Sequence, residues 1–342
     1  MNDFVLYPFA LVFPFLAGAL LMPVAYRYLG RSLADKPAGK LKKHTRRVPA
    51  LGGLLIFAAV LTTLTVIRFT TAFPSGTLHY LRGVFIGGGL IFALGLTDDL
   101  RKPEGVGIVV KLAVQALAAG ALMYYGVHVQ FVQSPYLVYP ITFLWLVGLT
   151  NAFNLLDIMD GLCVSQAVVC ALGLVVIALP QEFVYVNVAA LALLGACLSF
   201  WPANHRKKHQ IFLGDSGSTF LGFMLASLSM GTSYSEHSAC GFLAPLLILA
   251  VPLFDTGFVI LARLLKGKNP LKGSADHIAL RLKKLGWKPR RILGTFITAG
   301  VIFNMFAYAL TRCGADAAVW LFVITGVLLG AGALWLLSLP AD

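Results

Sequence analysis

The chain has 342 residues, of which 58% are hydrophobic and only 12% are charged, and its mean hydropathy is +0.83. A soluble domain carries roughly 25% charged residues, so this composition excludes an ordinary soluble globular protein. The formal net charge of +13 does not require a nucleic-acid partner, because basic loops held on the inner side of a membrane account for it.

Apolar stretches of roughly 20 residues recur along the whole chain, and each could cross a bilayer as an α-helix. We therefore predict an all-α fold, a polytopic integral membrane helical bundle of about eleven transmembrane helices in a single domain over residues 1–342. The first span is not expected to be a cleaved signal peptide, because the opening MNDF lacks basic residues. The expected spans are residues 4–26, 50–67, 80–97, 105–125, 137–155, 161–180, 183–202, 216–234, 239–263, 292–311 and 317–338.

The distribution of lysine and arginine predicts the orientation of the bundle. With the N-terminus outside, only Arg68, Arg82 and Arg312 of the 27 basic residues would face outward. The C-terminus then lies inside. The inner loops expected to carry an active site are 27–49, 98–104, 156–160, 203–215 and 264–291.

Acidic residues collect where the expected spans reach the inner face. TDDL (97–100) ends the third span, NAFNLLDIMDGL (151–162) follows the fifth, and FLGDSGSTFLG (212–222) opens the eighth. A polar stop at a helix end is the alternative for Asp98 and Asp99 taken alone. Because a helical bundle brings such ends together, the motifs predict an acidic floor, suited to a divalent cation that bridges carboxylates to a phosphorylated substrate.

In the second motif a polar residue recurs at every third position. On a helix such neighbours would share one edge, where amide and carboxylate oxygens could face a cation. Helix capping is the alternative for Asp160, which precedes Gly161. The four polar residues are Asn151, Asn154, Asp157 and Asp160.

The third motif predicts the start of a helix. Gly214 and Gly217 free the backbone there, and the exposed N–H groups of the helix would favour an anion. Asp215 is also a good N-cap residue. Phe212 is either an aromatic side chain at the membrane interface or a stacking surface for a base.

A fourth inner segment, SADHIALRLKKLGW (274–287), predicts a short helix lying on the membrane surface. An apolar stripe would dip into the membrane and a cationic stripe would face phosphate, with anchoring to membrane lipid alone as the alternative. The apolar stripe is Ile278, Leu282 and Leu285, and the cationic stripe is His277, Arg281 and Lys284.

Two further charged residues interrupt expected spans near their inner ends. Lys111 either extends its ammonium group to the membrane interface or reaches a diphosphate above the acidic floor. Asp255, in PLFDTGF, is expected to pair with a nearby cation.

With these motifs, the chain resembles the polyprenyl-phosphate N-acetylhexosamine-1-phosphate transferases of glycosyltransferase family 4. The resemblance runs from Asp35 to about Gly286 and rests on five motifs in order: DKPAGKLKKHTRRVPALGG, TDDL, NAFNLLDIMDGL, IFLGDSGSTFLG and DHIALRL. It implies a membrane enzyme of ten or eleven spans in the bacterial cytoplasmic (inner) membrane. Such enzymes use Mg2+ at a cytoplasmic site, with Mn2+ as a substitute, to transfer a sugar 1-phosphate from a UDP-sugar to undecaprenyl phosphate and release UMP, which starts the synthesis of a cell-surface glycopolymer.

The resemblance also implies roles for single residues. Asp215 would be the principal metal ligand, with Asn154 beside it, and Asp98 and Asp99 would be a catalytic pair. Asp157 and Asp160 would serve the nucleotide and the catalytic floor, and Phe212 would stack on uracil. The residues expected to contact the diphosphate are Lys111, His277 and Arg281, and the other substrate-binding residues are Asn151 and His44.

The sugar is left open, with N-acetylglucosamine preferred. The family often has further histidines in its last motif, where this chain has Ala279 and Leu280, and a different UDP-sugar, including UDP-MurNAc-pentapeptide, is the alternative. The histidine-rich loop typical of the MurNAc-pentapeptide transferases is absent from the sequence. A secondary transporter is a less favoured class, because transporters place ionisable groups near the membrane midplane. A lipid-binding scaffold is also less favoured, because it would leave the acidic residues of the inner face without a role. The oligomeric state, a homodimer included, is not fixed by the sequence.

Overall fold

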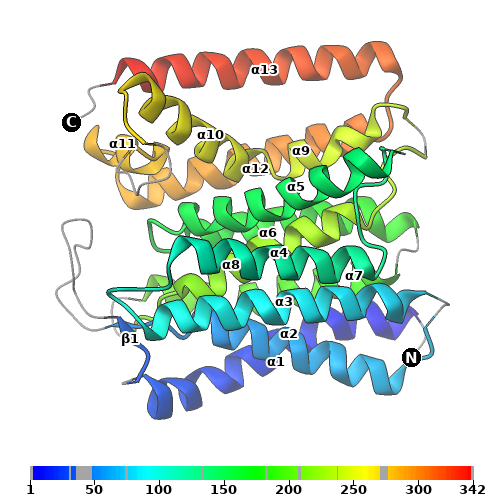
Figure 1. Cartoon of the computed structure of the whole chain (residues 1–342), viewed down its shortest axis with the longest axis vertical. Helices are drawn as coiled ribbons and strands as arrows, with labels where there is room; N and C mark the ends of the chain where they lie inside the picture. Colours follow the sequence, from blue (N-terminus) through cyan, green and yellow to red (C-terminus); the bar gives the residue numbers. More distant parts are fainter. Residues whose placement is uncertain are drawn as a thin grey trace. The chain divides into compact units, whose positions relative to one another are not determined.

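The computed structural model describes residues 3–30, 32–35, 48–73, 76–132, 134–181, 184–206, 209–236, 238–269 and 276–339. In these ranges the chain is predominantly α-helical (Figure 1). It forms two compact units, Met1–Thr232 and Ser233–Asp342. The all-α prediction is confirmed, and the description as a single domain stays a prediction.

The described residues of the first unit form eight α-helices, a short antiparallel strand pair and one 3-10 turn. In the strand pair Ala34 faces Pro49 and Asp35 faces Val48. The elements are α1 (Asp3–Leu29), β1 (Ala34–Asp35), β2 (Val48–Pro49), α2 (Gly52–Thr70), α3 (Thr77–Leu100), α4 (Ile108–Tyr124), α5 (Pro135–Leu156), α6 (Leu162–Ala178), η1 (Leu179–Gln181), α7 (Val184–His205) and α8 (Gly214–Met230).

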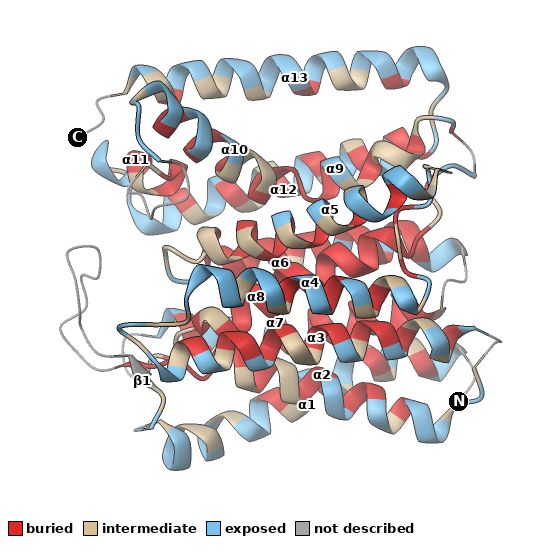
Figure 2. Cartoon of the chain, viewed as in Figure 1, coloured by how far each residue is buried: buried red, intermediate tan, exposed pale blue. Residues whose placement is uncertain are grey.

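The core of this unit is formed by α6, α7 and α8, which are buried along most of their length (Figure 2). Helix α7 packs against α1, α2 and α6, and α8 packs against α2, α3 and α5. In the most apolar window of each helix, 83% of α7 is buried but only 22% of α1. Helix α1 therefore keeps an apolar surface suited to lipid.

The second unit is also helical. Its elements are η2 (Gly241–Leu243), α9 (Ala244–Ile248), α10 (Ala250–Leu265), α11 (Ile278–Lys284), α12 (Pro289–Leu310) and α13 (Ala315–Ser338). Helix α12 packs against α9 and α10. Only 11% of the apolar window of α13 is buried inside the protein, which leaves the rest of this helix available to lipid.

Among the described residues, seven helices are long and apolar enough to cross a membrane, and the bent pair of η2–α9 and α10 would make eight. The chain is therefore a multi-pass membrane protein. Helices suit this environment because each satisfies its own backbone hydrogen bonds where water is absent. Each of the eleven expected spans falls on helical chain, but the number of crossings and their orientation stay predictions.

The segment expected as one span over 239–263 is not a single straight helix, because the chain bends by 68° between α9 and α10. Its crossing of the membrane stays a prediction. Pro252 lies in the first turn of α10. A proline has no backbone N–H, so Pro252 cannot donate a hydrogen bond to the carbonyl of Ile248 as a continuous helix would require. The helix therefore ends at Ile248 and restarts at Ala250.

A close approach of α3 to α8 positions the polar ends of both helices. A Cβ atom added at Gly95 of α3 would lie 2.5 Å from the Cα atom of Ser216 in α8. Only glycine permits this distance between the two backbones. As a result, the end of α3 that carries Asp98 and Asp99 lies beside the start of α8.

Candidate active site

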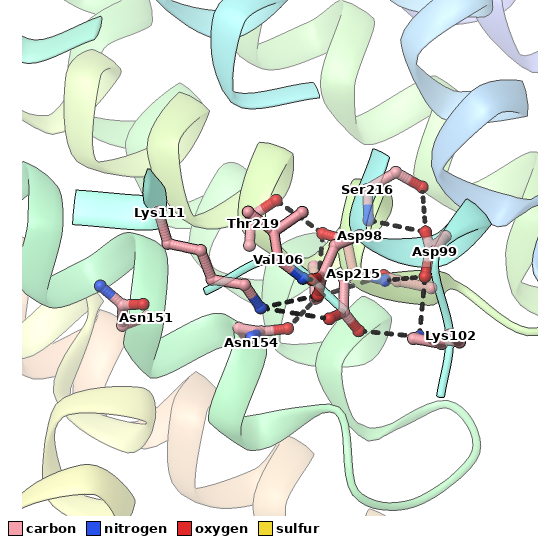
Figure 3. A network of polar contacts seen from close by, with 12 residues as sticks. Asp98, Asp99, Lys102, Val106, Lys111, Asn151, Asn154, Asp215, Ser216 and Thr219 are labelled. Atoms are coloured by element: carbon pink, nitrogen blue, oxygen red, sulfur yellow. Dashed lines mark hydrogen bonds and ion pairs between the residues drawn. The ribbon is translucent and has the colours of Figure 1, made fainter. Parts of the chain in front are cut away.

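The polar ends of α3, α4, α5 and α8 meet in one network in the first unit (Figure 3). Asp98 and Asp99 come from the last turn of α3, Lys111 comes from the first turn of α4, and Asp215 comes from the first turn of α8. The prediction that TDDL and GDSG meet is thus confirmed. The remaining contacts show that the members of this network are held in different ways.

Asp99 binds the N-terminus of α8 from the neighbouring helix. Its Oδ1 atom accepts a hydrogen bond from the backbone N–H of Asp215 at 2.9 Å. Its Oδ2 atom accepts from the backbone N–H of Ser216 at 3.0 Å and from the Ser216 hydroxyl at 2.8 Å. The side chain is 1% exposed. A helix N-terminus favours a negative charge, so Asp99 joins α3 to α8 through a buried carboxylate.

The backbone at Gly214 makes room for this carboxylate. Gly214 has φ +77°, and a Cβ atom there would lie 2.6 Å from Oδ2 of Asp99. An L-residue would therefore be strained by its backbone and would also collide with Asp99. Asp215 follows in the first turn of α8, and Leu213 is the N-cap residue. The N-cap alternative for Asp215 is therefore wrong.

Lys102 links the two motifs, although it is not among the residues predicted from the sequence. Its Nζ atom lies 2.7 Å from Oδ1 of Asp99 and 3.0 Å from Oδ1 of Asp215. Burial opposes the charge of this ammonium group, but the carboxylates of Asp215 and Asp99 outweigh that effect and raise the pKa of Lys102. Lys102 is therefore a permanent cation between two carboxylates.

Asp98 has a different set of partners from its neighbour. Its Oδ2 atom lies 2.6 Å from Nζ of Lys111, and its Oδ1 atom accepts a hydrogen bond from the backbone N–H of Val106 at 2.5 Å. Nζ of Lys111 also lies 3.9 Å from Oδ2 of Asp215. The side chain of Lys111 is 30% exposed and that of Asp98 is 5% exposed. Lys111 thus presents a cation at the edge of the network, and its contact with a diphosphate stays a prediction.

The two asparagines predicted from α5 lie next to this network (Figure 3). Oδ1 of Asn154 accepts a hydrogen bond from the hydroxyl of Ser218 in α8 at 2.8 Å. Asn151 instead pairs with the amide of Gln115 in α4, donating from Nδ2 at 3.0 Å and accepting at Oδ1 from Nε2 at 3.3 Å. Asn154 therefore lies toward the start of α8, and Asn151 ties α5 to α4.

The expectation that four polar residues share one helix edge is wrong beyond Leu156, where α5 ends. Asp157 is the C-cap residue, and Asp160 lies in the following turn. Asp160 is exposed and accepts a hydrogen bond from Nε2 of Gln210 at 2.8 Å. Gly161, with φ +80°, is the N-cap residue of α6, so the capping alternative for Asp160 does not hold either.

Asp157 has an environment that disfavours its charge. Burial raises the pKa of this carboxyl to about 8, and the negative charge of Asp215 adds to the effect. The Asp157 carboxyl is therefore protonated in a large fraction of the molecules at neutral pH. Because a cation placed nearby would lower this pKa again, Asp157 is suited to respond to positive charge in the network.

Phe212 lies in the segment that leads into α8. Its backbone N–H donates to the carbonyl of Pro49 at 2.8 Å, and its carbonyl accepts from the N–H of Gly52 at 2.9 Å. These bonds hold the end of the motif DKPAGKLKKHTRRVPALGG next to the motif IFLGDSGSTFLG, beside the network. The Phe212 side chain is partly exposed, and its expected stacking on a base stays a prediction. His44 lies outside the described residues.

The residues predicted from DHIALRL lie in the second unit, where α11 does not face outward as expected. His277 is 2% exposed and Arg281 is 4% exposed. Nη1 of Arg281 donates to the carbonyl of Leu336 at 2.9 Å, and Nη2 donates to Oδ1 of Asp276 at 3.1 Å. Of the expected cationic stripe, the helix buries His277 and Arg281 against carboxylate and carbonyl acceptors, whereas Lys284 is exposed. The periodicity of the sequence could not reveal these acceptors.

Asp255 pairs with His277 in this unit. Its Oδ2 atom lies 2.7 Å from Nδ1 of His277, and its Oδ1 atom accepts a hydrogen bond from the backbone N–H of Ile278 at 3.0 Å. Asp255 thus fixes the start of α11. Contacts of His277 and Arg281 with a diphosphate stay predictions.

The first-unit network has the chemistry of a site for a hard divalent cation. Its oxygen atoms belong to carboxylates and an amide, the ligands that Mg2+ and Mn2+ prefer, and two lysine ammonium groups already lie among them. Within the described ranges, however, no group of three or more His, Cys, Asp or Glu side chains could hold an ion as it stands. A cation would therefore have to replace a lysine at a carboxylate.

Comparison with known proteins identifies the family of the chain. The sequence profile of glycosyl transferase family 4 matches residues 81–233, a range that contains the whole network. A probable undecaprenyl-phosphate N-acetylglucosaminyl 1-phosphate transferase of Bacillus subtilis is 31% identical over 297 residues, which cover 84% of this chain and 78% of that protein. A decaprenyl-phosphate N-acetylglucosaminephosphotransferase of Mycolicibacterium smegmatis is 30% identical over 293 residues, which cover 76% of this chain and 71% of that protein.

A second kind of relative is also similar to this chain. A phospho-N-acetylmuramoyl-pentapeptide-transferase of Limosilactobacillus fermentum is 31% identical over 319 residues, which cover 87% of this chain and 95% of that protein. These matches confirm the resemblance drawn from the five motifs. The chain therefore belongs to glycosyl transferase family 4.

Proposed function

We propose that this chain transfers N-acetylglucosamine 1-phosphate from UDP-N-acetylglucosamine to undecaprenyl phosphate. A bond forms between an oxygen of the acceptor phosphate and the β-phosphorus of the donor. The bond between that phosphorus and the bridging oxygen breaks, and the oxygen leaves with UMP. The products are undecaprenyl-diphosphate-N-acetylglucosamine and UMP.

The observation that carries this proposal is the network of Asp98, Asp99, Asp215, Lys102 and Lys111. It combines two cations with three carboxylates at the ends of long apolar helices. A phosphorylated lipid and a nucleotide diphosphate sugar would meet at the ends of these helices, at the membrane surface, since the lipid chain lies in the membrane and the nucleotide remains in water. A secondary transporter fits less well, because its ionisable groups would be expected nearer the middle of the helices.

The contacts favour different roles for the two neighbouring aspartates. Asp99 is committed to the start of α8 and holds Asp215 in place. Asp98 contacts a lysine that is partly exposed, so Asp98 is the better candidate to take the remaining proton from the acceptor phosphate. Lys111 would then offset the negative charge of the two phosphorylated substrates.

Mg2+, with Mn2+ as a substitute, would be held by Asp215 and Asn154 and would supply positive charge that allows the two phosphorylated substrates to approach each other. The support for this part of the proposal is the oxygen-rich donor set. Asp157 lies close enough to Asp215 for their charges to interact, and it would gain a stable negative charge beside such an ion.

We also propose that the site faces the cytoplasm from the bacterial inner membrane. The excess of lysine and arginine in the loops on that side supports this orientation. Sealed vesicles of known orientation test it. A UDP-sugar added to inside-out vesicles should give UMP release, and the same addition to right-side-out vesicles should give none until the vesicles are opened.

Transfer of phospho-MurNAc-pentapeptide is the second candidate. The observation in its favour is the similarity to the Limosilactobacillus fermentum relative, since the match covers 95% of that protein. The relatives from Bacillus subtilis and Mycolicibacterium smegmatis, named for N-acetylglucosamine transfer, favour the first candidate. A panel of donors would separate the two.

The deciding experiment follows UMP release by the purified protein with undecaprenyl phosphate. The donors are UDP-N-acetylglucosamine, UDP-N-acetylgalactosamine and UDP-MurNAc-pentapeptide, each with Mg2+, with Mn2+ or with excess EDTA. We expect turnover with the first donor, in the presence of either metal but not in EDTA. Asp215→Ala should lose this turnover, whereas Glu104→Gln, at an exposed position in the same loop as Lys102, should retain it. Turnover with the pentapeptide donor alone would favour the second candidate.

A further inference from the structure

Lys102 occupies the position of a bridging cation in the network. Its ammonium group lies within 3.0 Å of an oxygen of Asp215 and 2.7 Å from an oxygen of Asp99. These two carboxylates come from different helices. Lys102 therefore joins α3 to α8 through charge, in addition to the hydrogen bonds that Asp99 makes with the backbone of α8.

The carboxylates on either side of Lys102 differ in how firmly they are held. Asp99 keeps its bonds to the backbone N–H groups of Asp215 and Ser216 whether or not Lys102 is present. The carboxylate of Asp215 has no such backbone donors in the described part of the chain. Its ion pairs are with Lys102 and Lys111, and it shares a side-chain hydrogen bond with Asp98. If Lys102 left, Asp99 would stay in place, and an oxygen of Asp215 would become available to another cation.

Lys102 lies in the turn after α3 rather than in a helix, and its side chain is 24% exposed. A lysine carries a compact charge on a flexible four-carbon chain, so its ammonium group can turn toward water or toward a phosphate without a change in the helices. A divalent cation and an ammonium group repel each other and therefore compete for the same oxygen of Asp215.

We propose that the ammonium group of Lys102 is a tethered counter-cation that occupies the cation position between Asp99 and Asp215. When a divalent cation binds, Lys102 dissociates from Asp215 and then pairs with a substrate phosphate. The second step rests on the proposed function, and the first does not. The exchange keeps the network close to neutral before the ion binds. It also makes a positive charge available at the moment when the phosphorylated substrates require one.

This proposal predicts that Lys102 weakens metal binding. Mn2+ binding by the detergent-purified chain, without substrates, can be measured from the loss of the free-ion signal in electron paramagnetic resonance. We expect Lys102→Met to bind Mn2+ about tenfold more tightly than the wild type, because the competing charge is absent. Lys102→Arg keeps the charge and should stay within about twofold of the wild type, since charge rather than shape sets the competition.

Arg101 provides a matched control in the same turn. It is exposed, and Arg101→Met removes the same charge from the loop. If general loop charge controlled metal affinity, both Met variants would bind Mn2+ more tightly. Unchanged or weaker binding in Lys102→Met, or an equal gain in Arg101→Met, would overturn the proposal.

A second measurement needs no variant and therefore does not depend on the folding of one. The wild-type chain is treated briefly with an amine-reactive acetylating reagent, with and without saturating Mg2+, and modification is followed by mass spectrometry. Modification of Lys102 should rise at least about threefold with Mg2+, because an ammonium group released from its carboxylates exchanges its proton with water more readily. Lys266 is an internal control, since it is also paired with an aspartate, Asp276, and is 25% exposed against 24% for Lys102.

The outcomes separate this inference from the proposed function. Equal modification of Lys102 with and without Mg2+, in protein that binds Mn2+, overturns the exchange even if UMP release requires a metal. Increased modification together with tighter Mn2+ binding in Lys102→Met supports the exchange even if no UDP-sugar gives UMP. Metal binding and the modification of Lys102 therefore test the exchange, whereas UMP release tests the transferase activity.

Discussion

Asp99 accepts a hydrogen bond from the backbone N–H of Ser216 at 3.0 Å, although 117 positions separate the two residues in the sequence. The start of a helix attracts an anion, and here that anion is a side chain of the protein itself. A phosphate at the start of α8 would have to displace a buried carboxylate. We therefore expect substrate phosphate to bind at the lysines and not at the α8 backbone.

This relationship predicts that Asp99→Asn mainly destabilises the first unit. An asparagine keeps one acceptor oxygen but turns its NH2 group toward N–H donors, so at least one charge-assisted hydrogen bond is lost and two donors face each other. We expect a loss of at least about 2 kcal/mol, because such bonds contribute about 1.5–3 kcal/mol each. Thermal unfolding in detergent measures the change.

Two variants serve as controls for this prediction. Ser216→Ala removes only the hydroxyl donor to Asp99 and should cost about 1 kcal/mol. Glu104→Gln changes an exposed acid in the neighbouring turn and should leave the unfolding temperature unchanged. Equal unfolding temperatures for Asp99→Asn and the wild type would contradict a holding role for Asp99.

Asp98 and Lys111 should act as one unit in catalysis. Lys111→Met leaves the 5% exposed Asp98 carboxylate without its ammonium partner, and we expect kcat/KM for the UDP-sugar to fall by about 1.5–3 kcal/mol in transition-state free energy. Asp98→Asn should cause a similar or larger loss. Because each change removes the same ion pair, the double variant should be no worse than the poorer single variant. Strictly additive losses would show that the two side chains act independently.

The sequence predicted the helices and the meeting of the acidic motifs well, for a physical reason. In a membrane the backbone must satisfy its own hydrogen bonds, so apolar stretches have few alternatives to a helix. The ends of those helices then lie at the same depth, at the membrane surface, which brings Asp98 and Asp215 together. The break before α10 could not be predicted from Pro252 alone, because Pro8, Pro14 and Pro23 lie inside α1 and Pro202 lies inside α7.

The partners within the site could not be predicted in the same way. Rules for helix caps consider neighbouring residues, whereas the anion at the start of α8 comes from Asp99 on another helix. Lys102 belongs to a loop whose charge the membrane orientation already explains, so nothing local indicated its bridge to Asp215. Long-range pairs of this kind depend on how the helices pack.

Arg281 should contribute to the stability of the second unit. Arg281→Ala leaves the carbonyl of Leu336 and a carboxylate oxygen of Asp276 without this donor. We expect a lower unfolding temperature and a loss of about 2–4 kcal/mol, because the guanidinium group is 4% exposed. Lys283→Ala, at an exposed position on the same helix, is the control. Normal stability of Arg281→Ala with a raised KM for the UDP-sugar would instead assign Arg281 to substrate binding.

Asp157 should make the stability of the metal-free protein depend on pH. Its pKa is about 8 in the folded protein against 3.8 as the ordinary value, so the folded state binds one more proton between these values. The stabilising effect of the neutral carboxyl is full below about pH 4, declines as pH rises, and is lost above about pH 8. In EDTA, the unfolding temperature of the wild type should therefore fall from pH 5 to pH 8 relative to Asp157→Asn. Glu104→Gln, at an exposed position, should keep the wild-type slope.

The order of bond formation can be tested by leaving out the lipid. Direct attack by the acceptor phosphate requires that lipid, so the protein with UDP-N-acetylglucosamine and Mg2+ alone should release no UMP in proportion to enzyme. A covalent aspartyl-phosphate intermediate would release one equivalent at once, since a carboxylate can also act as a nucleophile. We expect direct attack, because Asp99 has its oxygens bonded to α8 and Lys102, and Asp98 has its oxygens bonded to Lys111 and Val106. Asp98→Asn should then slow turnover with lipid by roughly 100-fold or more, the usual loss for a general base. A stoichiometric release of UMP without lipid that disappears in Asp98→Asn would show instead that Asp98 is the nucleophile.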